Sequence, residues 1–369
     1  MEKRINKVRK RFNDFGISAF LVSDIVHIRY LAGLKLAEKG DAYLLITGDH
    51  HFLITDGRYQ EAAKKHIKAG EVIIKTSAEG NKAIAQLIRE QNGETGFETE
   101  DLTAGKLQKF ERELSDSAVP DVVYRNFLSP IENLIEDISS IKDQGEIKKI
   151  KKAAEITDHI FQEHILDLIK PGIKETELAN KITYLGKEHG AEGDAFDQGP
   201  IVLFGPNSIF PHGDPPKIRK LRKGDIIQLD FGYFYKGYCS DFSRVLILGQ
   251  PTEEQKEIHK IVLEAQKRAI EAVKPGMKEW KLDKVARDFI EENGYEFIHG
   301  LGHGIGIKIH TKPHITKNVN GIIKPNQVFT IEPGIYIPGF GGMRIEDDVL
   351  VTKDGYEVLT KSSKELIIV

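Results

Sequence analysis

The sequence predicts two domains: an α/β domain over residues 1–128 and an α+β domain over residues 129–369. Short apolar runs alternate with helical patterns in the first part, which is typical of α/β structure. Long amphipathic helices and a set of repeated motifs fill the second part. At 369 residues the chain is long enough for each domain to bury a core of its own.

The first part contains four short apolar runs bounded by Gly, Asp or Ser, which is typical of buried strands. They are Ala19–Val22, Tyr43–Ile46, Phe52–Ile54 and Val72–Ile74. Apolar residues at helical spacing lie before and after them, at Ile5, Val8 and Phe12, at Ile84, Leu87 and Ile88, and at Leu107, Phe110 and Leu114. No motif in this part carries chemistry, and the segment Asn126–Pro130 is predicted to be the connection to the second part.

The second part contains an internal repeat. One long amphipathic helix is expected from about Ile147 to Pro171-Gly172, and another from about Thr252 to Pro275-Gly276. Three blocks return in the same order at offsets of 104, 104 and 102 residues: Lys170–Leu178 as Lys274–Leu282, Glu188–Gly190 as Glu292–Gly294, and Asp225–Gly232 as Gln327–Gly334. Two copies predict a duplicated α+β unit with approximate two-fold symmetry, since a solenoid needs three or more copies.

Two acidic residues in each half coincide across the repeat. Asp230 aligns with Glu332, and Asp241 aligns with Glu346 at an offset of 105 residues. Taken singly, each acid is more often a surface residue. Together they are what a two-cation site at the pseudo-axis requires.

The turns between these acids favour the same interpretation. Lys236-Gly237 is a hairpin signal that makes Tyr235 face Tyr238 and brings Asp230 and Asp241 close together. A Gly-rich turn lies between Glu332 and Glu346 in the same manner. The flanking residues are apolar, and buried carboxylates need partners. A metal is the simplest partner to propose.

Histidine supplies the remaining nitrogen ligand. His303 lies in Gly300–Gly306, where the glycines allow the backbone to approach an ion or a substrate closely. The glycine spacing of this run fits neither a dinucleotide loop nor a Walker A motif. Taken singly, His310 and His212 are more often plain polar residues.

Four carboxylates and one imidazole form an oxygen-rich donor set. The set suits two divalent ions per subunit, with manganese or cobalt preferred and zinc or iron also acceptable. Two such ions lower the pKa of a shared water and polarise a carbonyl group, so hydrolysis of an amide is favoured over redox chemistry.

The second part resembles the pita-bread metallopeptidases, a family that includes methionine aminopeptidase, aminopeptidase P and prolidase. The resemblance is closest to the proline-directed branch. The second-part motifs that carry it are Pro211-His212-Gly213, Asp230-Phe231-Gly232, Ser240-Asp241, Gly302–Gly306, His310, Pro313, Thr330–Gly334 and Arg344–Asp348. Ile28–Gly33 and Asp56–Tyr59 resemble the N-terminal domain of that branch, so the resemblance covers nearly the whole chain.

The resemblance implies a role for each metal ligand. Asp230 is expected to chelate one ion, and His303 and Glu332 the other. Asp241 and Glu346 are expected to bridge both ions.

It also implies the catalytic residues. Glu332 is expected to handle the proton of the attacking water, while His212 and His310 contact the substrate carbonyl. Arg344 is expected to brace the carboxylates, and Ser243 replaces the threonine that is usual in the family, keeping its hydroxyl. Thr311 departs from the pattern, because the residue after His310 is usually acidic.

The implied substrates are dipeptides or short peptides with proline at the second position, cleaved at the Xaa-Pro bond. A homodimer is implied by analogy. The sequence does not separate a dipeptidase from an aminopeptidase acting on longer peptides. A metal-free, creatinase-like hydrolase and a non-catalytic binding protein are rival functions for the same fold. Both predict eroded ligand positions, whereas all five positions are occupied here.

Composition excludes several classes of function. The net charge of −3, from 53 basic and 56 acidic residues, predicts no nucleic-acid partner. The single cysteine, Cys239, excludes an internal disulfide and a thiolate zinc cluster. No apolar run is long enough to span a membrane, and the charged start has no secretory signal, so a cytoplasmic protein is expected.

Overall fold

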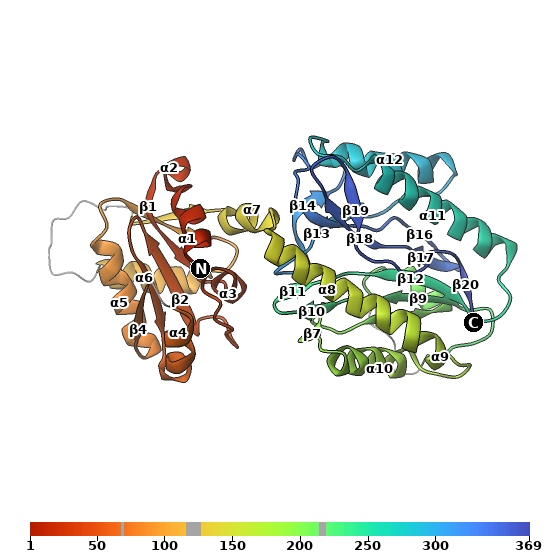
Figure 1. Ribbon diagram of the computed structural model, residues 1–369, viewed down its shortest axis with the longest axis horizontal. Helices are drawn as coiled ribbons and strands as arrows, with labels where there is room; N and C mark the ends of the chain where they lie inside the picture. Colours follow the sequence, from red (N-terminus) through yellow and green to blue (C-terminus); the bar gives the residue numbers. More distant parts are fainter. Residues whose placement is uncertain (68–69, 116–126, 214–218) are drawn as a thin grey trace. The chain divides into compact units, whose positions relative to one another are not determined.

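The computed structural model describes residues 1–67, 70–115, 127–213 and 219–369, and they form two compact units, Met1–Ile138 and Ser139–Val369 (Figure 1). The division falls within helix α7 (Leu134–Ser140). The predicted connection begins outside the described residues, at Asn126. Its last residues belong to strand β6 (Leu128–Ile131), so the boundary expected at 128/129 stays a prediction.

The first unit contains a six-stranded mixed sheet in the order β4-β3-β2-β1-β5-β6. Its first four strands are β1 (Ile17–Val22), β2 (Ala42–Thr47), β3 (His51–Thr55) and β4 (Glu71–Ile74), and each contains one of the predicted runs. Strands β5 (Glu94–Glu98) and β6 were not predicted. β5 pairs in parallel with β1 and with β6.

Helices complete the α/β character of this unit. They are α1 (Glu2–Arg9), α2 (Phe12–Phe15), α3 (Ile25–Ala32), α4 (Gln60–His66), α5 (Ser77–Arg89) and α6 (Ala104–Ser115). The predicted apolar positions of α5 and α6, such as Ile84 and Phe110, pack with Leu21 and Leu45 of the sheet in one buried cluster. The α/β interpretation of the first part is therefore confirmed.

Helices of the second unit recur in matching pairs. α8 (Gln144–Ile160) is matched by α11 (Glu253–Ala272), and α10 (Glu175–Glu188) by α12 (Glu279–Glu292), which begins and ends 104 residues later. Both α8 and α11 begin with a capping box, from Asp143 and from Thr252, which satisfies backbone N–H groups of the first turn. The first long helix is less regular than predicted, because a π-helical turn, η2 (Phe161–Ile165), separates α8 from the short α9 (Leu166–Leu168).

The strands of the second unit form several small sheets. One sheet has the order β20-β12-β9-β8, another β14-β13-β15-β18-β19, a third β11-β10-β7, and the fourth is the pair β16-β17. In the first half the strands are β7 (Gly193–Asp194), β8 (Ile201–Phe204), β9 (Ile226–Asp230), β10 (Tyr233–Tyr235), β11 (Tyr238–Cys239) and β12 (Ser243–Ile247). In the second half they are β13 (Gly302–Gly304), β14 (Thr311–Ile315), β15 (Val328–Ile331), β16 (Gly334–Ile337), β17 (Gly341–Arg344), β18 (Asp347–Val351), β19 (Tyr356–Val358) and β20 (Ile367–Ile368).

Two hydrophobic cores lie on opposite faces of these strands. Ile227 and Leu246 point into a core shared with α8 and α10. Their neighbours Ile226 and Val245 point into a core shared with α11 and α12. Successive side chains of a strand face opposite sides, so β9 and β12 have helices on both faces. Their functional residues therefore lie at strand ends and turns.

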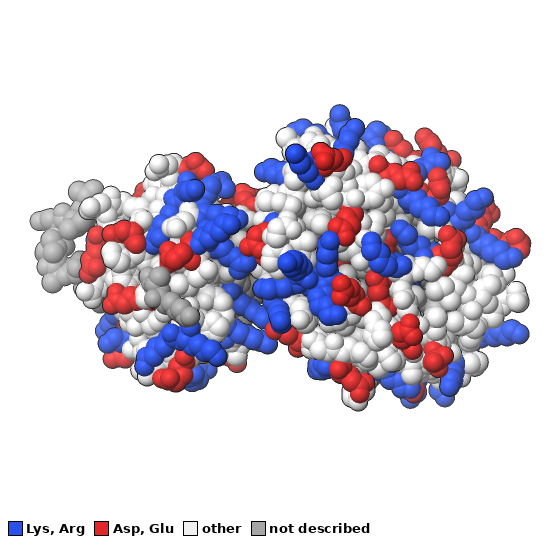
Figure 2. Space-filling view, in the orientation of Figure 1, with Lys and Arg blue, Asp and Glu red and all other residues white. Residues whose placement is uncertain are grey.

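The surface carries charges of both signs. On the visible face of the larger unit, basic and acidic side chains are interspersed with uncharged areas (Figure 2). Across the described part of the chain, no helix combines the length and the apolar composition that a membrane crossing needs.

Candidate metal centre

A cavity of about 280 Å³ lies within the second unit. Its wall contains every catalytic and metal-binding residue predicted from the sequence: His212, Asp230, Asp241, His303, His310, Glu332 and Glu346. Arg344 lines the cavity as well. The fold thus brings together residues that are up to 134 positions apart in the chain (212 to 346).

The first pair of acids is positioned by a hairpin. Asp230 is the last residue of β9 and pairs with Ser243 on β12. Between Asp230 and Asp241, β10 and β11 pair so that Tyr235 faces Tyr238, as predicted. Lys236 and Gly237 have φ angles of 48° and 79°, the left-handed values that a two-residue hairpin turn requires.

The second pair is positioned in the same way. Glu332 follows β15 and Glu346 precedes β18, and the β16–β17 hairpin lies between them. An isolated bridge between Ser243 and Glu346 joins the two halves. The repeat therefore places one acid of each half at or just after the end of a strand, and the other just before the strand that follows the hairpin.

The glycines beside His303 serve the packing of strands. A Cβ atom on Gly302 would lie 1.9 Å from the carbonyl oxygen of Thr330, and one on Gly304 would lie 2.1 Å from that of Lys312. Only glycine fits at these two positions. The sequence predicted a close backbone approach at these glycines, and the groups approached are the backbone carbonyls of Thr330 and Lys312. This packing fixes His303 at the cavity wall.

His303 faces carboxylates with one of its two nitrogens. Its Nε2 lies 3.3 Å from Glu332 Oε1 and 3.6 Å from Asp241 Oδ2. Its Nδ1 lies 3.3 Å from the carbonyl oxygen of Gly304, an arrangement that makes Nδ1 the donor and leaves the lone pair on Nε2. Burial lowers the pKa of His303 to about 3, so the ring is neutral at physiological pH and able to act as a ligand.

The acidic side chains of the cavity are buried beside one another, with few partners for their charges. Asp241 is 2% exposed and Glu346 is 1% exposed. Burial, reinforced by the neighbouring Glu346, raises the pKa of Asp241 well above its usual range. Burial, reinforced by Glu332, does the same to the pKa of Glu346. Burial raises the pKa of Glu332 to about 7, although Arg344 opposes the shift.

Two carboxylate oxygens of the cavity wall are buried without a hydrogen-bond partner among the described residues: Asp230 Oδ1 and Glu346 Oε1. Ligand atoms of Asp241, His303 and Glu346 all lie within 4.8 Å of one another. Unpaired oxygens, mutually repelling carboxylates and a neutral imidazole fit divalent cations as the missing partner. The residues present therefore fit a metal centre.

Arg344 and Ser243 surround the acids. Arg344 donates to Asp230 through Nη2 and to the Ser243 hydroxyl through Nε, the latter at 3.1 Å. Ser243 in turn donates to Glu346 Oε2 at 2.8 Å. The oxygens opposite these contacts on Asp230 and Glu346 are the two without partners, so the contacts leave those oxygens available to ions.

The sequence did not reveal His299, His314 and Tyr336. His299 and His314 line the cavity. The hydroxyl of Tyr336 lies 3.2 Å from His299 Nε2 and accepts a hydrogen bond from Arg344 Nη1 at 2.8 Å. Burial lowers the pKa of His299 to about 4, so its neutral ring accepts from Tyr336. The position of His299 just before the glycine run was the one available signal for it.

Comparisons with known proteins agree with this geometry. Residues 148–353 match the model of metallopeptidase family M24, and residues 4–126 match that of the creatinase/prolidase N-terminal domain. An Xaa-Pro dipeptidase of Pyrococcus furiosus is 37% identical over 369 residues, covering 100% of both chains. An uncharacterised peptidase of Bacillus subtilis is 37% identical over 374 residues, covering 99% of each.

Solved structures share the whole fold. An Xaa-Pro dipeptidase from Bacillus anthracis superposes with a TM-score of 0.91 at 37% identity, covering 100% of this chain and 99% of that one. An X-Pro aminopeptidase from Thermotoga maritima superposes with a TM-score of 0.84 at 34% identity, covering 98% and 100%.

Proposed function

The chain belongs to metallopeptidase family M24, and from this premise we propose that it hydrolyses the Xaa-Pro bond at the N-terminus of dipeptides or short peptides. One observation carries the proposal: four carboxylates and an imidazole share a cavity in which two buried carboxylate oxygens lack partners among the residues that the structure describes. A surface cluster of acids would be solvated and would not show this deficit.

We propose that Asp230, Asp241, His303, Glu332 and Glu346 hold two divalent ions, manganese or cobalt first. When bound, the ions supply Lewis-acid polarisation of the scissile carbonyl and a water of lowered pKa. Asp241 and Glu346 are assigned to both ions because each is enclosed by the other acids.

Glu332 is proposed as the general base. Its carboxylate lies on the cavity wall beside the other proposed ligands, where it could take the proton of the attacking water. Thr330 donates to Glu332 Oε1 at 3.0 Å and fixes the orientation of the carboxylate.

His212 and His310 are proposed to contact the substrate. Both are exposed side chains on the cavity wall, and the ring of His310 lies 4.3 Å from that of His303, centroid to centroid. From there they could donate to the scissile carbonyl oxygen as charge develops on it. Phe196 and Pro211 add apolar wall that suits a pyrrolidine ring.

Proline at the second position fits a site of this kind for a chemical reason. The nitrogen of an Xaa-Pro bond carries no hydrogen, so binding it leaves no buried donor to satisfy. The relatives carry the names of both a dipeptidase and an aminopeptidase. The choice between these activities, the homodimer and the cytoplasmic location remain predictions.

One assay tests the proposal. The protein is supplied with Mn²⁺ or Co²⁺ and given Ala-Pro, Ala-Pro-Ala and Ala-Ala. Cleavage of Ala-Pro alone identifies a dipeptidase, and cleavage of Ala-Pro-Ala identifies an aminopeptidase. Cleavage of neither, with under one ion bound per chain, favours the metal-free hydrolase or the binding protein and overturns the proposal.

A further inference from the structure

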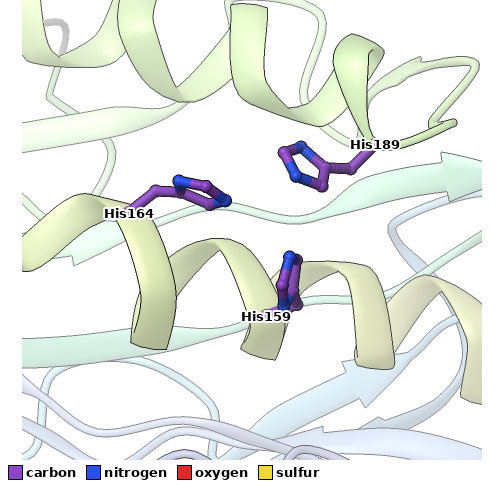
Figure 3. A group of neighbouring side chains, drawn as sticks. All are labelled: His159, His164 and His189. Carbon is purple, nitrogen blue, oxygen red and sulfur yellow. The ribbon is translucent and has the colours of Figure 1, made fainter.

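Three histidines converge at a place outside the cavity of the candidate metal centre. His159 lies in α8, His164 in the π-helical turn η2, and His189 directly follows α10. Figure 3 shows the three rings turned toward a common point. Their ring centroids are 4.8 to 5.4 Å apart in all three pairs.

We propose that His159, His164 and His189 form a second metal site, which takes a divalent transition ion of the kind that prefers imidazole, such as Zn²⁺. One nitrogen from each ring lies within 4.8 Å of the other two. In a tetrahedral zinc site with bonds of about 2.1 Å, the nitrogens are about 3.4 Å apart. Small rotations of the exposed His159 ring and the partly exposed His164 ring bring the nitrogens toward this separation.

The π-helical turn is what places two of the ligands together. His159 and His164 are five residues apart, and in a regular α-helix such residues diverge by about 140° around the axis. The i→i+5 pattern of a π-helix closes a wider turn and returns them to one face. The local break in α-helical geometry, which is often found at functional sites, therefore creates the ligand pair.

The third ligand has its ring orientation fixed. His189 Nδ1 lies 2.8 Å from the carbonyl oxygen of Leu185, so Nδ1 is the donor and Nε2 carries the lone pair. Metal-binding histidines commonly use their second nitrogen in this way. Three imidazoles without a carboxylate form a softer donor set than the oxygen-rich centre in the cavity, and such a set suits Zn²⁺, Ni²⁺ or Cu²⁺ better than Mn²⁺.

The exposure of the three side chains defines the role of the site. His159 is exposed, and His164 and His189 are partly exposed, so solvent fills the remaining coordination position. The backbone beneath is anchored, because Phe161 and Ile165 of η2 and Ile182 of α10 pack in the same buried core. A bound ion would cross-link η2 to the end of α10 and stabilise the first half of the repeat.

Zinc uptake tests the site. Chelator-treated full-length protein is dialysed against low-micromolar zinc chloride at neutral pH, and zinc per chain is measured for wild type, His164→Gln, His159→Gln and the control His50→Gln. Wild type and His50→Gln should bind one zinc ion more per chain than either of the other variants. The comparison isolates this site, because neither His159 nor His164 lines the cavity.

Thermal unfolding gives a second readout. Zinc should raise the Tm of wild type and His50→Gln by more than it raises the Tm of His164→Gln and His159→Gln, since an ion that binds only the folded state stabilises it. His159→Gln, at an exposed position, guards against a folding defect in His164→Gln. Equal zinc uptake in all four proteins, or a loss in His50→Gln as well, would overturn the proposal.

Discussion

Glu346 and Asp347 are neighbours in sequence and are both fully enclosed, yet they have opposite environments. Asp347, the first residue of β18, receives Arg244 Nη2, Gln266 Nε2 and Thr360 Oγ1, each at 2.7 Å. Burial raises the pKa of Asp347, but Arg244, Lys364 and Gln266 hold it below its usual range. Among the described residues, the Glu346 carboxylate has one hydrogen-bond partner, Ser243, and its second oxygen has none. Burial among other acids raises its pKa.

The difference separates a structural charge from a functional one. Successive residues of a strand point to opposite faces, so Asp347 faces the basic side chains of Arg244 and Lys364, while Glu346 faces other acids. A buried charge with complete partners needs nothing more. A buried acid without them is stable only when protonated or when a cation arrives. The exposed fraction alone does not distinguish the two residues, because both side chains are fully enclosed.

The largest effect is expected from Glu346→Gln. Loss of a carboxylate assigned to both ions should lower Xaa-Pro turnover by at least about 10³-fold, comparable with the loss of one key electrostatic contact in a catalytic site. The chelated variant should be as stable as wild type or more stable, because an unpaired buried acid is gone. Turnover and Tm are measured beside Glu365→Gln, an exposed control. Near-normal turnover would sink the bridging assignment.

Asp347→Ala should show the reverse pattern. The substitution leaves the buried Arg244 guanidinium without its carboxylate partner. It should lower the free energy of unfolding by about 3–5 kcal/mol. Denaturant unfolding measures this, with the partly exposed Asp288→Ala as control. Manganese binding per folded molecule should remain at the wild-type level. A stable variant that had lost its manganese would place Asp347 in the metal centre. It would contradict the distinction between a structural Asp347 and a metal-binding Glu346.

His212→Ala probes a residue that contacts the substrate without holding an ion. Turnover should fall by about 10²-fold, the scale of one lost catalytic contact, while the metal content stays unchanged. Metal analysis and steady-state kinetics are compared with His50→Ala. Loss of metal instead would move His212 among the ligands.

The smallest effect concerns pH. The pKa of Glu332 is raised from 4.5 to about 7, so between these values the folded chelated protein binds more protons than the unfolded chain. Its contribution therefore makes stability fall as pH rises, by at most about 1.4 kcal/mol per pH unit. The lowered pKa of His303 acts in the opposite direction.

A difference measurement isolates Glu332. The stability advantage of Glu332→Gln over wild type, both chelated, should grow from pH 4.5 to 7 and should vanish on adding Mn²⁺. A constant difference across this range would show that folding does not raise the pKa of Glu332.

Much of the fold followed from periodicity and the repeat. The predicted strands were those with uninterrupted apolar runs, such as Tyr43–Ile46. Strand β5 was not predicted, because its segment is short, contains Gly96 and has an acidic residue at each end, Glu94 and Glu98. Its middle is nevertheless buried between the parallel neighbours β1 and β6. Tertiary pairing overrode local propensity there. The π-helical turn was missed because i→i+5 hydrogen bonding has no distinct signature in an amphipathic pattern.

The site followed from motifs to a similar extent. The repeat aligns Asp230 with Glu332 and Asp241 with Glu346 in the sequence alone, and membership of the M24 family confirms the resemblance. The environments of Glu346 and Asp347 did not follow, since their partners Ser243 and Arg244 lie about a hundred residues away. His299 was overlooked because a place just before the glycine run does not by itself indicate a function, and its contact with Tyr336 is tertiary.

Manganese stoichiometry tests the central claim most directly. Chelator-treated wild type and Glu346→Gln are each titrated with Mn²⁺, an ion for which the three-histidine cluster has little preference. We predict two ions per chain in wild type and fewer than one in Glu346→Gln. Fewer than one ion in wild type, or two in both proteins, would contradict a dinuclear centre built on the unpaired carboxylates.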